Sequence, residues 1–148
     1  MARRRVSNLP IRFSAGSFIL NSGIGKLKTE PDRAKALHGI AKGSFPFFEN
    51  LEPEQFVQAL AVMEIGVGAA LMLPLVPDRL AGLALTPFAG GLIWMYANTE
   101  GMHEPGGIRP TGAGTALAKD VWLLGIGLTL LATGDRSKKR AKKRARTS

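Results

Sequence analysis

The stretch Ala116–Ala132, ALAKDVWLLGIGLTLLA, is apolar along most of its length but places Lys119 and Asp120 side by side near its beginning. A helix that crosses the hydrocarbon core of a bilayer needs roughly 20 mainly apolar residues. The run reaches that length only if Lys119 and Asp120 lie inside the helix or at its edge. The stretch therefore predicts either a membrane span with two charges near one end or an apolar core helix of a soluble bundle.

Three other apolar runs decide between these alternatives: Phe13–Gly25, Phe56–Val76 and Leu80–Ala97. A surface helix of a soluble protein shows a polar face with a period of 3.6 residues, and none is visible in Leu80–Ala97. A cleaved signal peptide would explain the first run, which arginines precede, but not the other runs. We therefore predict an all-α fold, a four-transmembrane-helix bundle, with helices at about 9–26, 54–76, 79–99 and 114–133.

The chain has 148 residues and a net charge of +9, and this charge is concentrated at its two ends. Arg3, Arg4 and Arg5 precede the first run, and eight basic residues follow Asp135. The rest of the chain has nine basic and eleven acidic residues. The chain has no cysteine, which excludes disulfides, Cys-ligated zinc and iron–sulfur clusters.

The charge distribution divides the chain into a transmembrane domain, residues 1–135, and a basic tail, residues 136–148, that we expect to be disordered. In a soluble module such a tail would indicate a nucleic-acid-binding arm. Directly after a membrane span it indicates attraction to anionic lipid, at about 1 kcal/mol per basic residue near the surface. We therefore expect membrane lipids as partners of the tail and no nucleic acid.

The charges also predict the orientation of the bundle. With four spans, both termini lie on one side, together with thirteen basic residues; seven lie on the other side. The positive-inside rule places both termini in the cytoplasm of a bacterial plasma membrane. The aromatic residues expected near the outer interface agree with this orientation, because Trp and Tyr favour that depth. They are Phe45, Phe47, Phe48, Trp94, Tyr96 and Trp122.

The first outer loop predicts an interfacial helix. Thr29 can cap it, Pro31 suits its first turn and Gly43 can end it. Its apolar residues recur at helical spacing, so one face can lie on the bilayer. These residues are Ala34, Leu37, Ile40 and Ala41, and His38 adjoins the same face, as an interfacial histidine or, alternatively, a ligand.

Two short motifs resemble known sites without matching them. His103–Glu104 lacks the second histidine of a zinc-binding HExxH helix, because Gly107 stands at that position. The stretch LNSGIGKL lacks the first glycine and the final hydroxyl of a phosphate loop, where Leu20 and Leu27 stand. We therefore expect neither a metal site nor a nucleotide site.

Polar residues within the predicted spans are the candidate site. Ionisable groups in a bilayer are costly and face the bundle interior or a partner. Arg12 and Lys26 flank the short first run, where they could extend to the surfaces. Asp120 with Lys26, and Glu64 with Lys119, are our expected pairs. The candidate ligand or polar-cluster residues are Arg12, Asn21, Lys26, Glu64, Lys119 and Asp120.

Helix contacts are predicted from small residues that recur every four positions. They are Gly82, Thr86 and Gly90 in the third span, and Gly125, Thr129 and Thr133 in the fourth. Such stripes let membrane helices approach closely.

Four segments together resemble the DoxX-like family of small four-helix bacterial membrane proteins. They are SAGSFILNSGIGKL behind Arg12, MEIGVGAALML, PDRLAGLAL and LAKDVWLLGIGL, within residues 9–134. The resemblance implies an accessory role beside terminal-oxidase or thiosulfate–quinone oxidoreductase systems, with quinone or lipid nearby. It does not imply catalysis. Carried over by position, Arg12, Lys26, Glu64, Arg79, Lys119 and Asp120 match the polar residues of the family.

The sequence and the resemblance together favour two functions. The first is an accessory or assembly subunit without its own enzyme activity or cofactor, working with oxidoreductase partner subunits or as a homo-oligomer. The second is a small carrier or receptor for a lipid, quinone or other amphipathic ligand, with an outer-leaflet cavity lined by Asn21, Glu64 and Asp120. A soluble nucleic-acid binder is a third class, which detergent-dependent extraction would eliminate.

Overall fold

The computed structural model describes residues 8–145, and for residues 134–145 the backbone alone. Over this range the fold is all-α, as predicted, and contains no β-sheet. The elements are α2 (Leu9–Lys26), α3 (Pro31–Ser44), the 3-10 helix η1 (Pro46–Asn50), α4 (Pro53–Met72), α5 (Asp78–Asn98), α6 (Thr115–Ala118) and α7 (Val121–Ala145).

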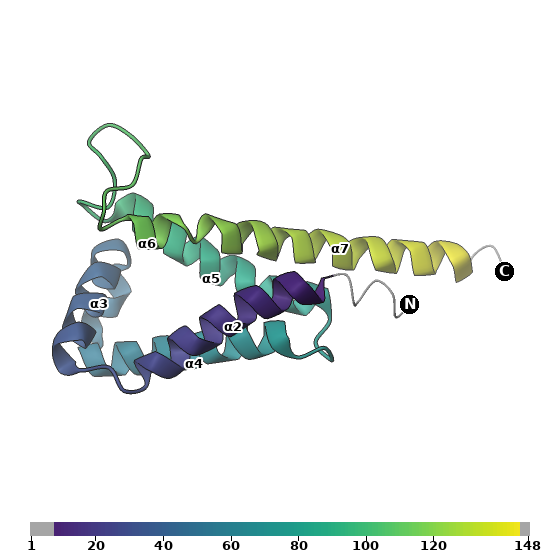
Figure 1. The fold of residues 1–148 in the computed structure, drawn as a ribbon, viewed down its shortest axis with the longest axis horizontal. Helices are drawn as coiled ribbons and strands as arrows, with labels where there is room; N and C mark the ends of the chain where they lie inside the picture. Colours follow the sequence, from purple (N-terminus) through teal and green to yellow (C-terminus); the bar gives the residue numbers. More distant parts are fainter. Residues whose placement is uncertain (1–7, 146–148) are drawn as a thin grey trace.

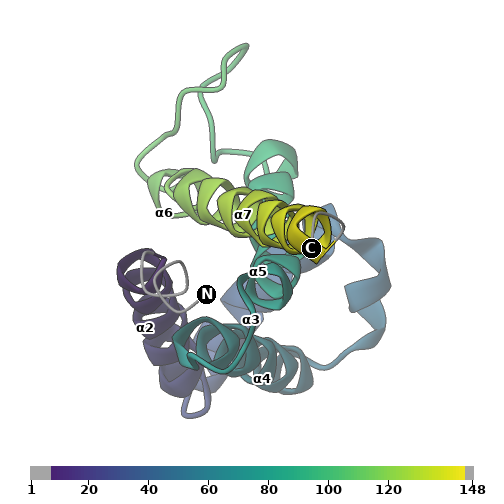
Figure 2. The same cartoon turned by 90° about the vertical axis from the view of Figure 1, so that its right-hand side faces the viewer.

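The long helices α2, α4, α5 and α7 run along a common direction and alternate in sense (Figure 1). They pack mainly as two pairs, α2 against α4 and α5 against α7. In the end-on view of Figure 2, α5 lies between α4 and α7 and joins the pairs. The pairs come together at the end where α2 begins and spread apart toward the end where α3 lies (Figure 1).

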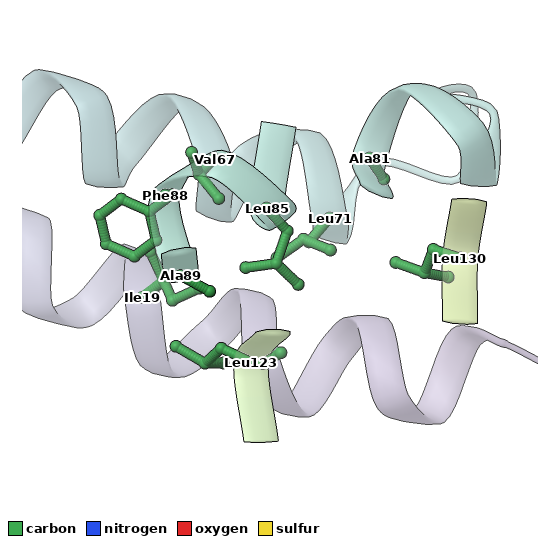
Figure 3. Close-up of a cluster of buried hydrophobic side chains, with 10 residues drawn as sticks. Ile19, Val67, Leu71, Ala81, Leu85, Phe88, Ala89, Leu123 and Leu130 are labelled. Atoms are coloured by element: carbon green, nitrogen blue, oxygen red, sulfur yellow. The ribbon is translucent and has the colours of Figure 1, made fainter. Parts of the chain in front are cut away.

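One apolar core joins all four long helices. Ile19 of α2, Leu71 of α4, Leu85 of α5 and Leu123 of α7 are buried in it (Figure 3). Leu130, farther along α7, is buried at the end of the same core near Ala81 (Figure 3). Burial of such side chains stabilises a fold by roughly 1.5–3 kcal/mol each in water. In a bilayer this advantage is smaller, so close packing carries more of the association.

Three helical segments among the described residues are long and apolar enough to cross a membrane: Pro53–Met72, Asp78–Asn98 and Thr115–Thr133. These correspond to three of the four predicted spans. The remaining predicted span, the first along the chain, is α2. It is a helix over residues 9–26, as predicted, but it is not among the segments long and apolar enough to cross a membrane. The last span is interrupted, because α6 ends at Ala118 and α7 begins at Val121.

Lys119 and Asp120 occupy this interruption. The backbone N–H of Asp120 donates to Leu117 O at 3.0 Å and that of Trp122 donates to Lys119 O at 3.1 Å. Bonds over three residues tighten the chain locally, as in a 3-10 turn. The two adjacent charges therefore mark a local departure from the α-helix.

Helix α3 lies across the spread end of the bundle (Figure 1), and the prediction for its apolar face was wrong. Ala34 and Ala41, expected to lie on the bilayer, are buried against Phe56 and Val57 of α4. This face therefore covers α4, because contact with another helix buries it more completely than an interface can. At the far end of α3, Trp94 Nε1 donates to the Ser44 carbonyl at 3.3 Å and joins α3 to α5.

Glycines form the closest contacts within both helix pairs. A Cβ on Gly68 would lie 2.7 Å from Leu20 N, and one on Gly23 would lie 2.9 Å from Ala61 O, so α2 and α4 touch through their backbones. In the other pair, a Cβ on Gly82 would lie 2.8 Å from Gly127 O, and one on Gly127 would lie 2.6 Å from Thr86 Oγ1. All four distances are shorter than those that real Cβ atoms show.

The predicted small-residue stripes are therefore right in part. Gly82 and Thr86 lie at the contact between α5 and α7, whereas Gly90 and Gly125 have open space where a Cβ would stand. Gly127 takes the place expected for Gly125, because the crossing of the two helices turns that side of α7 toward α5.

Helix α7 continues to Ala145, beyond residue 133 where we predicted the span to end. The expectation of disorder in the tail, residues 136–148, stays a prediction: the helix as described includes residues 136–145, and residues 146–148 lie outside the described range. Alanine, lysine and arginine are strong helix formers. A helix that continues from an existing one needs no new nucleus, so the tail extends it at little cost.

Candidate functional site

Arg12 is buried at the end of the bundle where α2 begins, with 2% of its surface exposed. Its guanidinium donates hydrogen bonds to four carbonyls: Leu71 O at 2.8 Å, Val76 O and Leu73 O at 2.9 Å, and Ala70 O at 3.0 Å. Two of these carbonyls, those of Ala70 and Leu71, lie in the last turn of α4, where a helix lacks internal partners and carries partial negative charge. The prediction that Arg12 extends toward the membrane surface was wrong, because this cluster of carbonyls satisfies it inside the protein.

Asp78, at the start of α5, completes this cluster. Its Oδ1 accepts from Arg12 NH1 at 2.7 Å, and its Oδ2 accepts from Asn8 Nδ2 at 2.9 Å. Asn8 Nδ2 also lies 3.3 Å from Thr133 Oγ1 of α7. We call Asn8, Arg12, Asp78 and Thr133 the terminal clamp, because they join α2, α4, α5 and α7 at one end. Asn8 and Asp78 were not among the partners that we predicted from the sequence.

Glu64 of α4 is buried, with 5% of its surface exposed, and pairs with Lys26 of α2 at 2.9 Å. Lys26 Nζ also donates to Ser22 Oγ at 2.7 Å. The predicted partners were therefore wrong: Lys26 pairs with Glu64, in place of Asp120. Close approach of the helices at Gly23, next to the Glu64 Cβ, brings the two side chains within reach.

Asp120 is half-buried at the junction of α6 and α7. Lys119 is exposed. The structure thus pairs Lys26 with Glu64 across α2 and α4, whereas no ion pair among the described side chains includes Lys119 or Asp120. Buried ion pairs of this kind lose much of their solvation, so each charge depends on its partner.

Asn21 is exposed on α2 and lines, together with Lys26, a hollow of about 210 Å³. The cavity that we predicted from Asn21, Glu64 and Asp120 differs in composition from this hollow, whose lining includes neither carboxylate. Its lining residues come from the end of α2, the following turn and the start of α3. They are Asn21, Ser22, Gly25, Lys26, Thr29 and Arg33.

His38 is buried in the contact between α3 and α4. Its Nε2 lies 2.8 Å from Phe48 O, and its ring lies 5.5 Å from that of Phe56. These contacts assign it a packing role and favour neither of the uses considered from the sequence. Within the described residues, no group of three histidine or acidic residues is arranged to hold a metal ion.

The pairing of Arg12 with Asp78 could have been predicted from the expected depth of the two residues in the membrane. Arg12 precedes the first apolar run and Asp78 begins the third span, so both lie at the cytoplasmic end of the predicted bundle. We predicted pairs only among polar residues of the outer half. The pairing of Lys26 with Glu64, in contrast, depends on how α2 rotates against α4, which no single helix reveals.

Comparisons with protein-family models, with curated proteins and with solved structures found no match to this chain.

Proposed function

We propose that the chain is a multi-pass protein of the bacterial plasma membrane in which α2 joins the three apolar segments as a fourth span. The lateral surface of the long helices supports insertion. Large apolar side chains on it are exposed, among them Phe18 at 67%, Val62 at 66% and Trp122 at 71%. A surface of this kind is stable in lipid and would drive association in water.

Hydroxyl groups on the same surface also suit a membrane. Ser14 Oγ donates to Ile11 O at 3.2 Å, and Ser17 Oγ donates to Ser14 O at 3.2 Å. On α7, Thr129 Oγ1 donates to Gly125 O at 2.8 Å. Each hydroxyl thereby satisfies its donor within its own helix, as lipid requires.

The charges of α2 do not oppose its insertion. Its two ionised side chains, Arg12 and Lys26, form ion pairs with Asp78 and Glu64, which neutralise them. Its 18 residues span roughly 27 Å at 1.5 Å per residue, close to the thickness of the hydrocarbon core. Alignment beside α4 along the pair supports the same depth for both helices.

The proposed orientation has both termini and the α4–α5 turn in the cytoplasm. Because the chain lacks cysteine, single cysteines can report on each side without interference. We expect a membrane-impermeant maleimide to label Ile108→Cys in intact spheroplasts and Leu75→Cys only after permeabilisation. Both positions are exposed, at 91% and 87%. Rapid labelling of Leu75→Cys in intact spheroplasts would contradict the orientation.

We propose that the protein works as a non-catalytic accessory or assembly subunit beside a membrane oxidoreductase, as the DoxX-like resemblance implies. The observation that supports this role best is the exposure of the last span, Thr115–Thr133. Only 17% of its apolar window is buried within the protein, so most of this helix is free to contact a partner. Gly125 and Thr129 are exposed on it, and small residues of this kind are typical of helix contacts in membranes.

Gentle extraction followed by native mass spectrometry tests this role. We expect wild-type protein to retain partner subunits in fixed stoichiometry, and Gly125→Leu to lose them while keeping its own thermal stability. Gly66→Leu is the matched control, because Gly66 is also exposed with open space around it but lies on α4. Isolation of a monomer without partners from native membranes would exclude the assembly role.

The alternative function, a carrier or receptor for an amphipathic ligand, is favoured by the hollow lined by Asn21 and Lys26. A small molecule retained by an isolated monomer would support it. The chemistry of the hollow indicates which class of molecule to test.

A further inference from the structure

The hollow at the end of α2 has the lining of an anion-binding site. Two of its residues, Lys26 and Arg33, are cationic, and the side chains of Asn21, Ser22 and Thr29 add neutral hydrogen-bonding groups. No carboxylate lines it. Its volume of about 210 Å³ is several times what one water molecule requires.

Both cations retain hydrogen-bonding capacity. The Lys26 ammonium has three donors, of which Ser22 Oγ and Glu64 Oε2 accept two. Among the side chains that the structure describes, no ion pair includes Arg33. Lys26 is held in place by its partners, whereas Arg33, on the first turn of α3, can adjust to a ligand.

The position of the hollow indicates a lipid as the source of the anion. It lies where α2 ends and α3 turns across the bundle, at the outer interface of the proposed orientation (Figure 1). Phe18 precedes Asn21 by three residues, so both lie on one side of α2, and both are exposed. A head group in the hollow would thus have an apolar side chain beneath it for an acyl chain.

We propose that this hollow binds the phosphate group of a phospholipid from the outer leaflet. Arg33 and the free donor of Lys26 bind the phosphate oxygens, the Asn21 amide donates from the side, and Phe18 contacts an acyl chain. Guanidinium and ammonium groups bind phosphate through charge-assisted hydrogen bonds, which are stronger than neutral ones. This inference rests on the proposed insertion of α2 into the membrane.

Gly25 allows the hollow to be filled without disturbing the fold. A Cβ at this position meets nothing within 4 Å, and Gly25 lies inside a helix, where a larger residue is tolerated. Gly25→Leu therefore blocks the hollow and Arg33→Gln removes one cation. The matched controls are Gly66→Leu and Arg109→Gln, at exposed positions outside the hollow.

Binding is measured by native mass spectrometry of detergent-solubilised full-length protein with added phosphatidylglycerol, with diacylglycerol of the same chains, or with inorganic phosphate as competitor. We expect one phosphatidylglycerol per protein, at least tenfold weaker binding of diacylglycerol, and no displacement by millimolar phosphate. Arg33→Gln and Gly25→Leu should each weaken phosphatidylglycerol binding about tenfold, while both controls bind like wild type.

Equal binding by all variants, or equal binding of diacylglycerol, would overturn the proposal, since it would show contact with lipid in general. Displacement by inorganic phosphate would overturn the lipid source and indicate a soluble phosphate ligand. Failure of the membrane proposal is seen separately, as extraction of the protein by salt or alkali without detergent.

Discussion

Among single residues, Arg12 shows how a membrane protein can use a buried charge for structure. Its guanidinium neutralises Asp78 and donates to the Ala70 and Leu71 carbonyls in the last turn of α4. Lysine has a point charge and three donors, so it cannot reproduce the five donors of the planar guanidinium. The side chain therefore acts as a C-terminal cap for α4 that is supplied by another helix.

Arg12→Ala should lower the free energy of unfolding by about 3 kcal/mol, because it leaves the half-buried Asp78 without its cation. Thermal unfolding in detergent would measure the loss, and Arg109→Ala is a control at an exposed loop position. A double-mutant cycle with Asp78→Ala should show coupling of at least about 1 kcal/mol. Additive effects would show that the two residues act independently.

Glu64 and Lys26 should behave as a pair. Glu64→Leu alone leaves the Lys26 ammonium without its carboxylate partner and should cost about 3 kcal/mol. Adding Lys26→Met should restore stability to near the wild-type value, because both buried charges are then gone. Unfolding midpoints of the two single variants and the double variant test this. If the double variant is as unstable as Glu64→Leu, the loss comes from altered packing.

Thr86 offers a stabilising change. Its Oγ1 is buried and, among the described atoms, lacks a hydrogen-bond partner. Thr86→Val has nearly the same shape and removes the unsatisfied hydroxyl, so we expect it to raise stability by about 1 kcal/mol. Thr129→Val is the control, because Thr129 Oγ1 bonds to Gly125 O and faces outward. A fall in the melting temperature of Thr86→Val would indicate that its hydroxyl has a partner.

Among the elements, glycines form the closest contacts within each of the two helix pairs. Gly16, Gly23 and Gly68 bring α2 and α4 together, and Gly82 and Gly127 do the same for α5 and α7. This is expected where lipid competes with apolar side chains and only close approach of backbones favours association.

Two glycines of α4 provide a direct test. A Cβ on Gly68 would collide with the backbone of α2, whereas Gly66 has open space. Gly68→Val should destabilise the protein by about 1–3 kcal/mol. Gly66→Ala should be neutral or stabilise it by about 0.5–1 kcal/mol, since alanine favours the helix. Similar melting temperatures for both variants would contradict the packing of α2 on α4.

For the whole molecule, the fold class could be predicted from sequence because three of the four long helices contain an apolar run longer than a soluble surface helix would allow. For the candidate site, the sequence identified residues that take part in it, such as Arg12, Lys26 and Glu64, but not which of them form ion pairs with each other. Which charges meet depends on the rotation of α2 against α4 and on the break at Lys119 and Asp120, and both are tertiary effects. The contact of Gly127 with α5 also depends on tertiary packing, and the four-residue repeat of small residues did not predict it.

The molecule should also assemble from two halves, residues 1–75 and 76–148, expressed together. Each half contains one tightly packed helix pair, and a shared core joins them. We expect the halves to copurify in detergent, and Arg12→Ala to lower the recovery of the second half several-fold because it breaks the link to Asp78. Recovery unaffected by Arg12→Ala would show that the core alone holds the halves together.

The pairing of helices also implies an order of biogenesis. α2 finds its partner in the next long helix to be synthesised, and α5 does so in α7, so neither pair needs a segment from the other half. The first hairpin can thus close while the ribosome is still translating the second. Arg12 then has no carboxylate partner until Asp78 has been synthesised. A nascent chain halted before α5 would therefore contain an unpaired buried cation, which quality-control proteases could recognise.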